Sequence, residues 1–212
     1  MGTQPLKIGL DFDNTIVCYD EAISLLADEM FRLPPDLPRT KLDLRDHLRN
    51  VGREQEWTAF QGELYGPGMA YAQPFEGAIE TMKALVEEGH HLTIVSHRSL
   101  RPYAGPSYNL HEAARDWVYK RLRSAGLFLD EGRGHEGSNI YFLETRQAKI
   151  AKITEIGCDI FVDDLPEIIF SPDFPSTTVG VLFRPDDKGA SEYCKHHISA
   201  WHQLHTLLAQ VL

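Results

Sequence analysis

The sequence predicts an α/β fold, a doubly wound and mostly parallel sheet that carries a small helical insert. Three observations support this prediction. Short apolar segments alternate with longer amphipathic ones along most of the 212 residues, which is typical of strand–helix repeats in a parallel sheet. Several apolar segments end directly in a polar side chain, and such sheets bind ligands at the carboxyl ends of their strands. Residues 20–73 break the alternation with helical segments alone.

The elements of the sheet domain follow from hydrophobic periodicity. We expect strands near residues 6–10, 91–95, 139–143, 159–162 and 177–183. We expect helices near residues 75–88, 109–125, 147–156 and 191–210. The strands are short, bounded apolar runs, as buried strands are, and the helices place apolar residues on one face.

The insert is expected to be helical. A helix from Glu21 to Phe31 ends at the proline-rich segment Leu33–Pro38, and two polar helices follow near residues 40–50 and 53–64. A cluster of glycines and prolines between Gly62 and Pro74 has the composition of a hinge. The predicted domains are a core of residues 1–19 and 74–212 and a small helical insert of residues 20–73.

The first strand runs directly into Asp11 and Asp13. Because alternate side chains of an extended segment share a face, both carboxylates can reach one point beyond the strand. Their repulsion is relieved by a divalent cation, and carboxylate oxygens suit Mg²⁺. One carboxylate could attack phosphorus while the other transfers a proton. A strand end with an ordinary turn at Asp13–Asn14 explains the same pattern.

Further polar residues follow later strands in a fixed order. Ser96 ends the strand that begins at His91, Lys149 opens a helical stretch, and Asp163–Asp164 end the strand that begins at Asp159. The ordered set resembles the four motifs of the haloacid dehalogenase (HAD) superfamily of phosphohydrolases, and it spans nearly the whole chain. The resemblance implies a Rossmann-like core, with the insert as a cap that closes over the site and selects the substrate.

The resemblance also implies a role for each motif residue. Asp11 would be the nucleophile that forms an aspartyl-phosphate, and Asp13 the general acid and base. Ser96 would bind a phosphoryl oxygen, and Lys149 would supply positive charge to the phosphoryl group. Lys152, three residues further on, competes with Lys149 for this role. A second acid two residues after the nucleophile is typical of the phosphatases in the family, which argues against C–halogen or C–P chemistry.

The implied metal is Mg²⁺. Its ligands would be one oxygen of Asp11, the backbone carbonyl of Asp13 and the carboxylate of Asp164, with waters and substrate completing the set. Asp163 would be an additional ligand or a partner of the ligands, since a double Asp here replaces the usual pair of a small residue and Asp. Whether Asp163 or Asp164 binds the metal directly stays open.

His97 and Arg98 follow Ser96 at the expected catalytic end. With Ser96 and Lys149 they form the expected substrate-binding set, since local cations favour an anionic substrate in an acidic protein. Three arginines of the insert form either a solvated face or substrate contacts in a closed cap: Arg45, Arg49 and Arg53. The histidine-rich segment 193–205 resembles a metal cluster, but solvated histidines on an amphipathic helix explain it better, since structural zinc needs four convergent ligands.

Composition limits the classes of function. Lys and Arg number 21 against 31 Asp and Glu, a net charge of −10, which argues against a nucleic-acid partner. The cysteines, Cys18, Cys158 and Cys194, are few and far apart, which predicts no disulfide framework and a cytoplasmic protein. No apolar run is long enough to span a bilayer, so no membrane association is expected.

We therefore expect a Mg²⁺-dependent phosphomonoesterase that acts on a small phosphorylated metabolite, such as a nucleotide or a sugar phosphate. Two alternatives remain at this stage. One is a phosphoryl transferase or mutase of the same superfamily, and the other is a non-catalytic binding or regulatory module that kept the fold. Neither the substrate nor the oligomeric state follows from the sequence.

Overall fold

The structure, a computed structural model, describes residues 4–128, 139–186 and 194–211. These residues divide into two compact units. The sheet unit takes in the residues up to 17, residues 74–97 and those from 122 onward. The helical unit comprises residues 18–73 and 98–121. Each unit is described by itself.

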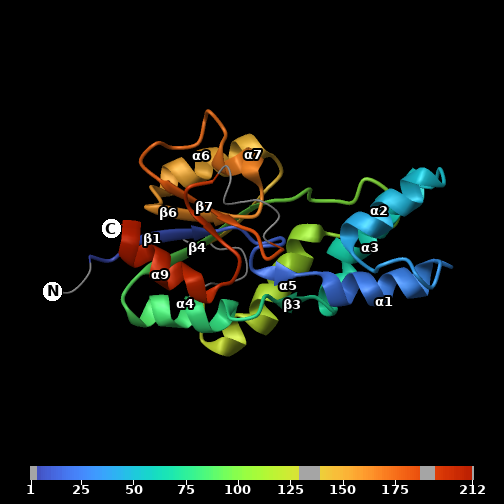
Figure 1. The fold of residues 1–212 in the computed structure, drawn as a ribbon, viewed down its shortest axis with the longest axis horizontal. Helices are drawn as coiled ribbons and strands as arrows, with labels where there is room; N and C mark the ends of the chain where they lie inside the picture. The colour runs from blue at the N-terminus through green and yellow to red at the C-terminus, as the bar shows by residue number, and fades with distance from the viewer. Residues whose placement is uncertain (1–3, 129–138, 187–193, 212) are drawn as a thin grey trace. The chain divides into compact units, whose positions relative to one another are not determined.

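The sheet unit is a three-layer α/β arrangement (Figure 1). Its strands are β1 (Lys7–Leu10), β4 (His91–His97), β5 (Ile140–Leu143), β6 (Ile160–Asp163), β7 (Val179–Phe183) and β8 (His197–Ile198). Their order is β5-β4-β1-β6-β7-β8, and every pairing is parallel. The helices α6 (Arg146–Ile156) and α7 (Pro166–Ile169) cover one face, and α4 (Ala78–Glu87) and α9 (His202–Val211) cover the other. The predicted fold class is confirmed.

Strand β1 lies in the middle of the sheet and is apolar because both of its faces are covered. Ile8 and Leu10 are buried, and Gly9 allows a close approach by β6. A Cβ atom on Gly9 would lie 2.4 Å from Cδ2 of Phe161, a distance that real side chains do not tolerate. Phe161 itself belongs to the core cluster beneath α6 and α7.

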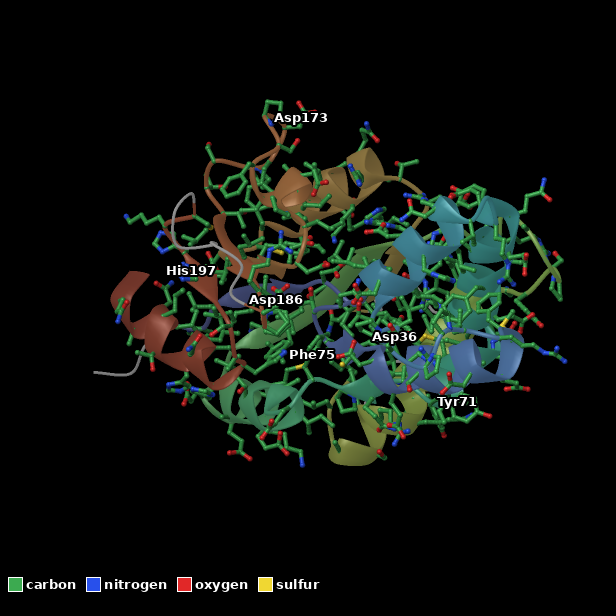
Figure 2. All side chains as sticks on the ribbon, turned by 45° about the vertical axis from the view of Figure 1, so that its right-hand side comes forward. Asp36, Tyr71, Phe75, Asp173, Asp186 and His197 are labelled. Carbon is green, nitrogen blue, oxygen red and sulfur yellow. The ribbon has the colours of Figure 1, made fainter. Side chains whose placement is uncertain are left out.

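The opposite face of the sheet has an aromatic core. The ring of Phe75, which is labelled in Figure 2, packs edge-on against Phe183 with 4.9 Å between the ring centroids. Trp201 lies 6.1 Å from Phe183 on the same measure. The Trp201 Nε1–H donates to the backbone oxygen of Thr15 at 3.1 Å, so the C-terminal segment is tied to the loop that follows β1.

The predicted helix over residues 191–210 is wrong in its first part. His197–Ile198 form the edge strand β8, and α9 begins only at His202; residues 191–193 lie outside the described residues. The outer edge of β7 has backbone N–H and C=O groups that can pair with an extended segment but not with a helix. Leu182 N–H donates to the oxygen of His196 at 2.9 Å. Tertiary pairing therefore outweighs the helical pattern of this segment.

The helical unit contains the predicted insert. Its elements are α1 (Asp20–Met30), α2 (Lys41–Asn50), α3 (Glu54–Tyr65), the 3₁₀ turn η1 (Pro67–Ala70) and α5 (Leu110–Arg121). Thr40 caps α2, since its side-chain oxygen accepts from Asp43 N–H at 3.1 Å. The aromatic rings of Trp57, Phe60 and Phe31 pack together in its core. The short strands β2 (Val17–Cys18) and β3 (Gln73–Pro74) pair where the chain enters and leaves the insert.

The segment 98–121 groups with the insert because α3 offers it a face of small residues. A Cβ atom on Gly62 would lie 2.9 Å from Cβ of Pro102, and one on Gly66 would lie 2.8 Å from the ring of Tyr108. The Tyr108 hydroxyl donates to the Glu63 carboxylate at 2.8 Å. The loop after Arg98 therefore packs directly on α3.

Among the described helices of both units, none is long and apolar enough to cross a membrane.

Candidate active site

The candidate site is built at the carboxyl ends of three neighbouring strands. Asp11 follows β1, Ser96 and His97 end β4, and Asp163 ends β6. β1 lies between β4 and β6, and Asp11 N–H donates to the backbone oxygen of Val162 in β6 at 2.9 Å. Parallel strands bring their carboxyl ends to one edge of the sheet, so residues 85 or more positions away from Asp11 in sequence become its neighbours there.

Lys149 joins the first and last acidic motifs. Its side chain is fully buried, with Nζ 2.5 Å from Asp11 Oδ1 and 2.6 Å from Asp163 Oδ2. Burial disfavours the charged amine, but the two carboxylates outweigh burial and raise the pKa of Lys149 above its usual value. The residue is therefore a permanent ammonium. Lys152 instead pairs with Glu155 at 2.6 Å.

Three carboxylates converge beside Lys149. Asp11, Asp163 and Asp164 each offer an oxygen, and these oxygens lie within 4.8 Å of one another. Burial, followed by the negative charge of Asp11, raises the pKa of Asp163 to about 7 against the pull of Lys149. Clustered carboxylate oxygens without a thiolate are a donor set that suits a hard divalent cation. The residues present therefore fit Mg²⁺.

The two acids of the last motif differ in their surroundings. Asp163 is completely buried, and its Oδ1 accepts from Leu165 N–H at 3.0 Å while Oδ2 faces Lys149. Asp164 is only partly buried and belongs to the same acidic cluster. Asp163 thus acts as the partner of Lys149, whereas Asp164 presents its carboxylate nearer to solvent.

Asp13 lies in a tight loop after β1. Ile16 N–H and Val17 N–H both donate to the backbone oxygen of Phe12, at 3.1 Å and 2.9 Å, and Asn14 adopts a positive φ of 59°. The left-handed conformation at Asn14 turns the chain back at once. Asp13, which is half-buried, thus lies in a turn three residues after Leu10, the last residue of β1.

Ser96 places a hydroxyl group that lacks a protein partner beside the cluster. Its side chain is 1% exposed, and within the described residues its Oγ is buried and has no hydrogen-bond partner. An unsatisfied buried hydroxyl costs about 1–3 kcal/mol. A hydrogen bond from a ligand oxygen at this place would remove that cost.

His97 and Arg98 have different surroundings although they are adjacent in sequence. Burial, then the positive charge of Lys149, lowers the pKa of His97, while Asp11 and Asp13 act in the opposite direction. His97 is therefore close to the charged groups of the site. Arg98 belongs to the helical unit, where its guanidinium lies 5.5 Å from the ring centroid of Tyr65.

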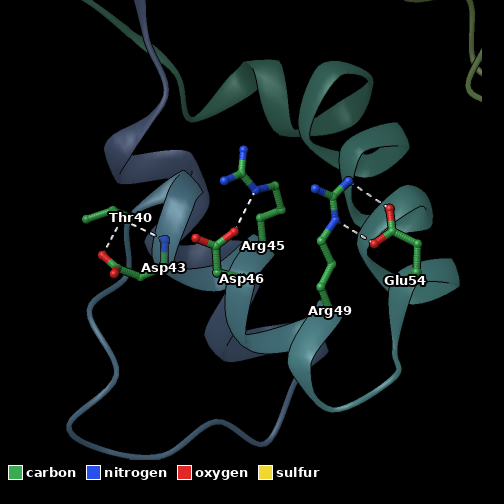
Figure 3. Close-up of polar contacts among 6 residues, drawn as sticks. All are labelled: Thr40, Asp43, Arg45, Asp46, Arg49 and Glu54. Carbon is green, nitrogen blue, oxygen red and sulfur yellow. Dashed lines mark hydrogen bonds and ion pairs between the residues drawn. The ribbon is translucent and has the colours of Figure 1, made fainter.

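Three arginines of the insert, Arg45, Arg49 and Arg53, are engaged in ion pairs, and Figure 3 shows those of Arg45 and Arg49. Arg49 donates through Nε and Nη2 to both carboxylate oxygens of Glu54, at 2.6 Å and 2.9 Å. Arg45 pairs with Asp46 at 2.8 Å, and Arg53 makes a similar two-bond pair with Glu56. This is the arrangement of a solvated charged face.

The histidine-rich C-terminal segment forms no metal cluster within the described residues. His197 Nδ1 lies 3.2 Å from the backbone oxygen of Cys194, and His205 Nε2 lies 2.6 Å from Glu88 Oε1. Among the described residues, the acidic cluster at Asp11 is the one group of three or more potential ligands.

One charged residue at this edge, Arg146, is not among the residues predicted from the sequence. Arg146 opens α6 one turn before Lys149, and its charge contributes to lowering the pKa of His97. Because helical residues three or four positions apart share a face, the position of Arg146 three residues before Lys149 is the signal that could have identified it.

Comparison with known proteins identifies the fold. Neither a protein-family profile nor a curated protein matches the chain. Among solved structures, a predicted phosphatase from Clostridium acetobutylicum is 11% identical, with a TM-score of 0.62, and 98% of this chain and 100% of that chain are covered. The HAD-hydrolase YfnB from Bacillus subtilis, solved with bound magnesium, is 15% identical with a TM-score of 0.57, covering 97% and 99%.

A predicted phosphoglycolate phosphatase from Haemophilus somnus is 14% identical with a TM-score of 0.57, covering 97% and 99%. The chain therefore has the fold of the HAD-superfamily hydrolases. At these identities, the likeness establishes the fold and leaves the activity to be argued from the site.

Proposed function

We propose that this protein is a Mg²⁺-dependent phosphomonoester hydrolase that acts through an aspartyl-phosphate. The observation that carries the proposal is the buried Lys149 ammonium held between Asp11 and Asp163, with the Ser96 hydroxyl on the adjacent strand. A fixed ammonium and a buried hydroxyl at the carboxyl edge of the sheet suit a phosphoryl group, which spreads negative charge over its oxygens during transfer.

The reaction would proceed in two steps. An oxygen of Asp11 forms a bond to phosphorus as the bond to the ester oxygen breaks, and Asp13 protonates the leaving alkoxide. Asp13 then takes a proton from a water molecule that attacks phosphorus, which releases inorganic phosphate and restores Asp11. Lys149 and Ser96 stabilise the phosphoryl oxygens in both steps.

Mg²⁺ would be held by Asp11, the backbone carbonyl of Asp13 and the carboxylate of Asp164. When bound, it neutralises charge on the transferring group. Asp163 holds Lys149 by direct ion pairing, and this pairing would position the ammonium beside Asp11.

The insert, residues 20–73, would act as a cap over a core of residues 1–19 and 74–212. The substrate would be a small phosphate ester such as a nucleotide or sugar phosphate, and the cap would supply much of the selectivity. His97 and Arg98 complete the proposed substrate-binding set with Ser96 and Lys149. The free cysteines, Cys18, Cys158 and Cys194, favour a cytoplasmic location.

The test is a screen of phosphorylated metabolites and p-nitrophenyl phosphate with Mg²⁺, in which release of inorganic phosphate is measured. We expect phosphate release by the wild-type protein and none by Asp11→Asn, since an amide cannot attack phosphorus. Asp173→Asn, at an exposed position of the sheet unit, makes the same chemical change away from the site and should retain activity.

Three outcomes would contradict the proposal. Near wild-type activity of Asp11→Asn would exclude the aspartyl-phosphate. Transfer of the phosphoryl group to another alcohol without release of phosphate would indicate a transferase or mutase. Absence of turnover with every substrate, together with ligand binding, would indicate a non-catalytic module.

A further inference from the structure

Arg146 places a second positive charge at the edge of the candidate site. It is the first residue of α6, and Lys149 lies three residues later on the same helix. Helical residues three apart are neighbours, with Cβ atoms about 5–6 Å apart. Because Lys149 is fully buried against Asp11 while Arg146 is exposed, Arg146 lies one turn nearer to solvent on the same side of the helix.

Among the described residues, no carboxylate neutralises the charge of Arg146. In the ranges 4–128, 139–186 and 194–211, no carboxylate forms an ion pair with Arg146, and the first turn of α6 contains no acidic residue. Glu144 is the nearest acid in the sequence and is exposed. The N-terminus of a helix already carries partial positive charge, so an unpaired arginine there is electrostatically unfavourable. A bound anion would reverse that cost.

His97 faces the same region from the neighbouring strand. It ends β4, which pairs with β5 so that His97 lies opposite Leu143, and the chain reaches α6 directly after β5. The imidazole is half-buried, and within the described part of the chain no hydrogen bond to it is found. Its pKa is lowered chiefly by burial and also by Lys149 and Arg146, against Asp11 and Asp13.

Within the described part of the chain, His97 is thus a polar side chain without a hydrogen-bond partner and Arg146 a cation without an ion pair, both next to the place where the phosphoryl group would bind. We propose that Arg146 and His97 bind a second anionic group of the substrate, so that the preferred substrate is a short phosphate ester carrying a carboxylate or a second phosphate. This inference rests on the proposed phosphatase function. The reach of an arginine side chain from the first turn of α6 limits the second anion to a few bonds from the ester oxygen.

The geometry also assigns different tasks to the two cations of α6. Lys149 is sequestered between Asp11 and Asp163 and acts on the phosphoryl group of every substrate. Arg146 is exposed and contacts the part of the substrate that varies. Loss of Arg146 should therefore change the choice between substrates and leave the chemical step nearly unchanged.

The test compares three esters that share a two-carbon skeleton: phosphoglycolate, ethylene glycol bisphosphate and 2-hydroxyethyl phosphate, with p-nitrophenyl phosphate as a reference. We expect kcat/KM of wild-type protein to be about tenfold or more higher for one of the two esters that carry a second anionic group than for 2-hydroxyethyl phosphate, the size of a charge-assisted hydrogen bond. Comparison of phosphoglycolate with ethylene glycol bisphosphate shows whether a carboxylate or a second phosphate is preferred.

Arg146→Gln should remove most of this preference through a rise in KM for the preferred ester, while its kcat changes less than about twofold. The rates on 2-hydroxyethyl phosphate and p-nitrophenyl phosphate should also change less than about twofold. Arg146→Lys, which keeps the charge, should retain part of the preference. His97→Asn should weaken the preference in the same direction. Lys152→Gln removes one charge from the same helix where Lys152 pairs with Glu155, and it should leave the ratios unchanged.

The outcomes separate this inference from the proposed function. Hydrolysis of p-nitrophenyl phosphate without a preference for either ester that carries a second anionic group, or a preference that survives Arg146→Gln, overturns the second anion site and leaves the phosphatase intact. Absence of hydrolysis with all four esters overturns both. An equal loss on all four esters in Arg146→Gln would mean that Arg146 only supports the fold or the phosphoryl site.

Discussion

Replacing Lys149 with Met should destabilise the metal-free protein strongly. Methionine keeps most of the length and volume of the lysine side chain. It removes the ammonium that lies 2.5 Å from Asp11 and 2.6 Å from Asp163. Removing one partner of a buried ion pair costs about 3–5 kcal/mol, because the remaining charge is buried without compensation. Here two carboxylates lose the same partner, and proton uptake by Asp163 limits the cost to the lower part of this range.

The assay is unfolding by urea and by heat at pH 7 in the presence of a chelator, followed by circular dichroism. A loss of about 3 kcal/mol should lower the melting temperature by about 10 °C in a chain of this size. Lys152→Met is the matched control on the same helix. Its side chain is 20% exposed and pairs with Glu155, which is 69% exposed, so we expect a loss below about 1 kcal/mol.

A double-mutant cycle isolates the ion pair. In the Lys149→Met background, Asp163→Asn removes one of the two carboxylates that the first change leaves unpaired, so the double variant should be more stable than the sum of the single losses predicts. We expect a coupling of about 2 kcal/mol. Additive losses, or a loss below about 1 kcal/mol for Lys149→Met, would refute the bridge between the two acidic motifs.

The remaining predictions concern metal, insert and packing. Phosphatase activity should disappear with chelator and return with Mg²⁺; a preference for Zn²⁺ that is lost with His197 and His202 would instead support a histidine site. Met69→Ala in the helical unit should change KM for the natural substrate more than for p-nitrophenyl phosphate, since the small ester needs few cap contacts; equal losses on both would argue against the insert as the selectivity element. Gly9→Ala should cost about 1–3 kcal/mol by overpacking against Phe161, and a neutral effect in urea unfolding would contradict the close approach of β1 and β6.

Much of the fold could be predicted because buried parallel strands are distinctive in sequence. The predicted strands at residues 6–10 and 159–162 correspond to β1 and β6 within a residue at each end, since both are apolar runs bounded by polar residues. The edge strand β8 could not be predicted. Its two residues, His197–Ile198, are a strand only because β7 offers them a free edge, and nothing local distinguishes them from the start of an amphipathic helix.

The grouping of residues 98–121 with the insert was likewise hidden in the sequence. A helix that follows a strand is expected to return to the sheet, and α5 has the length for that. The deciding contacts are made by residues without side chains, Gly62 and Gly66, which let the loop around Pro102 and Tyr108 approach α3 closely. Glycine has a low helix propensity, so these glycines suggest from sequence only a less stable helix. In the structure they allow the loop to pack closely.

The convergence of Asp11, Lys149 and the Asp163–Asp164 pair could be predicted from the sequence, but the different surroundings of the two acids could not. Asp163 and Asp164 are chemically identical neighbours, and only the direction of each side chain at the end of β6 distinguishes them. Asp163 continues the buried face of the strand toward Lys149, and Asp164 points to a less buried place in the same cluster. The doublet of acids at this strand end therefore divides its tasks: Asp163 holds Lys149 by an ion pair, and the partly buried Asp164 adds a carboxylate to the acidic cluster. A small residue in the first position would leave Lys149 paired with Asp11 alone, so in this chain the bridge to the last motif depends on the doublet.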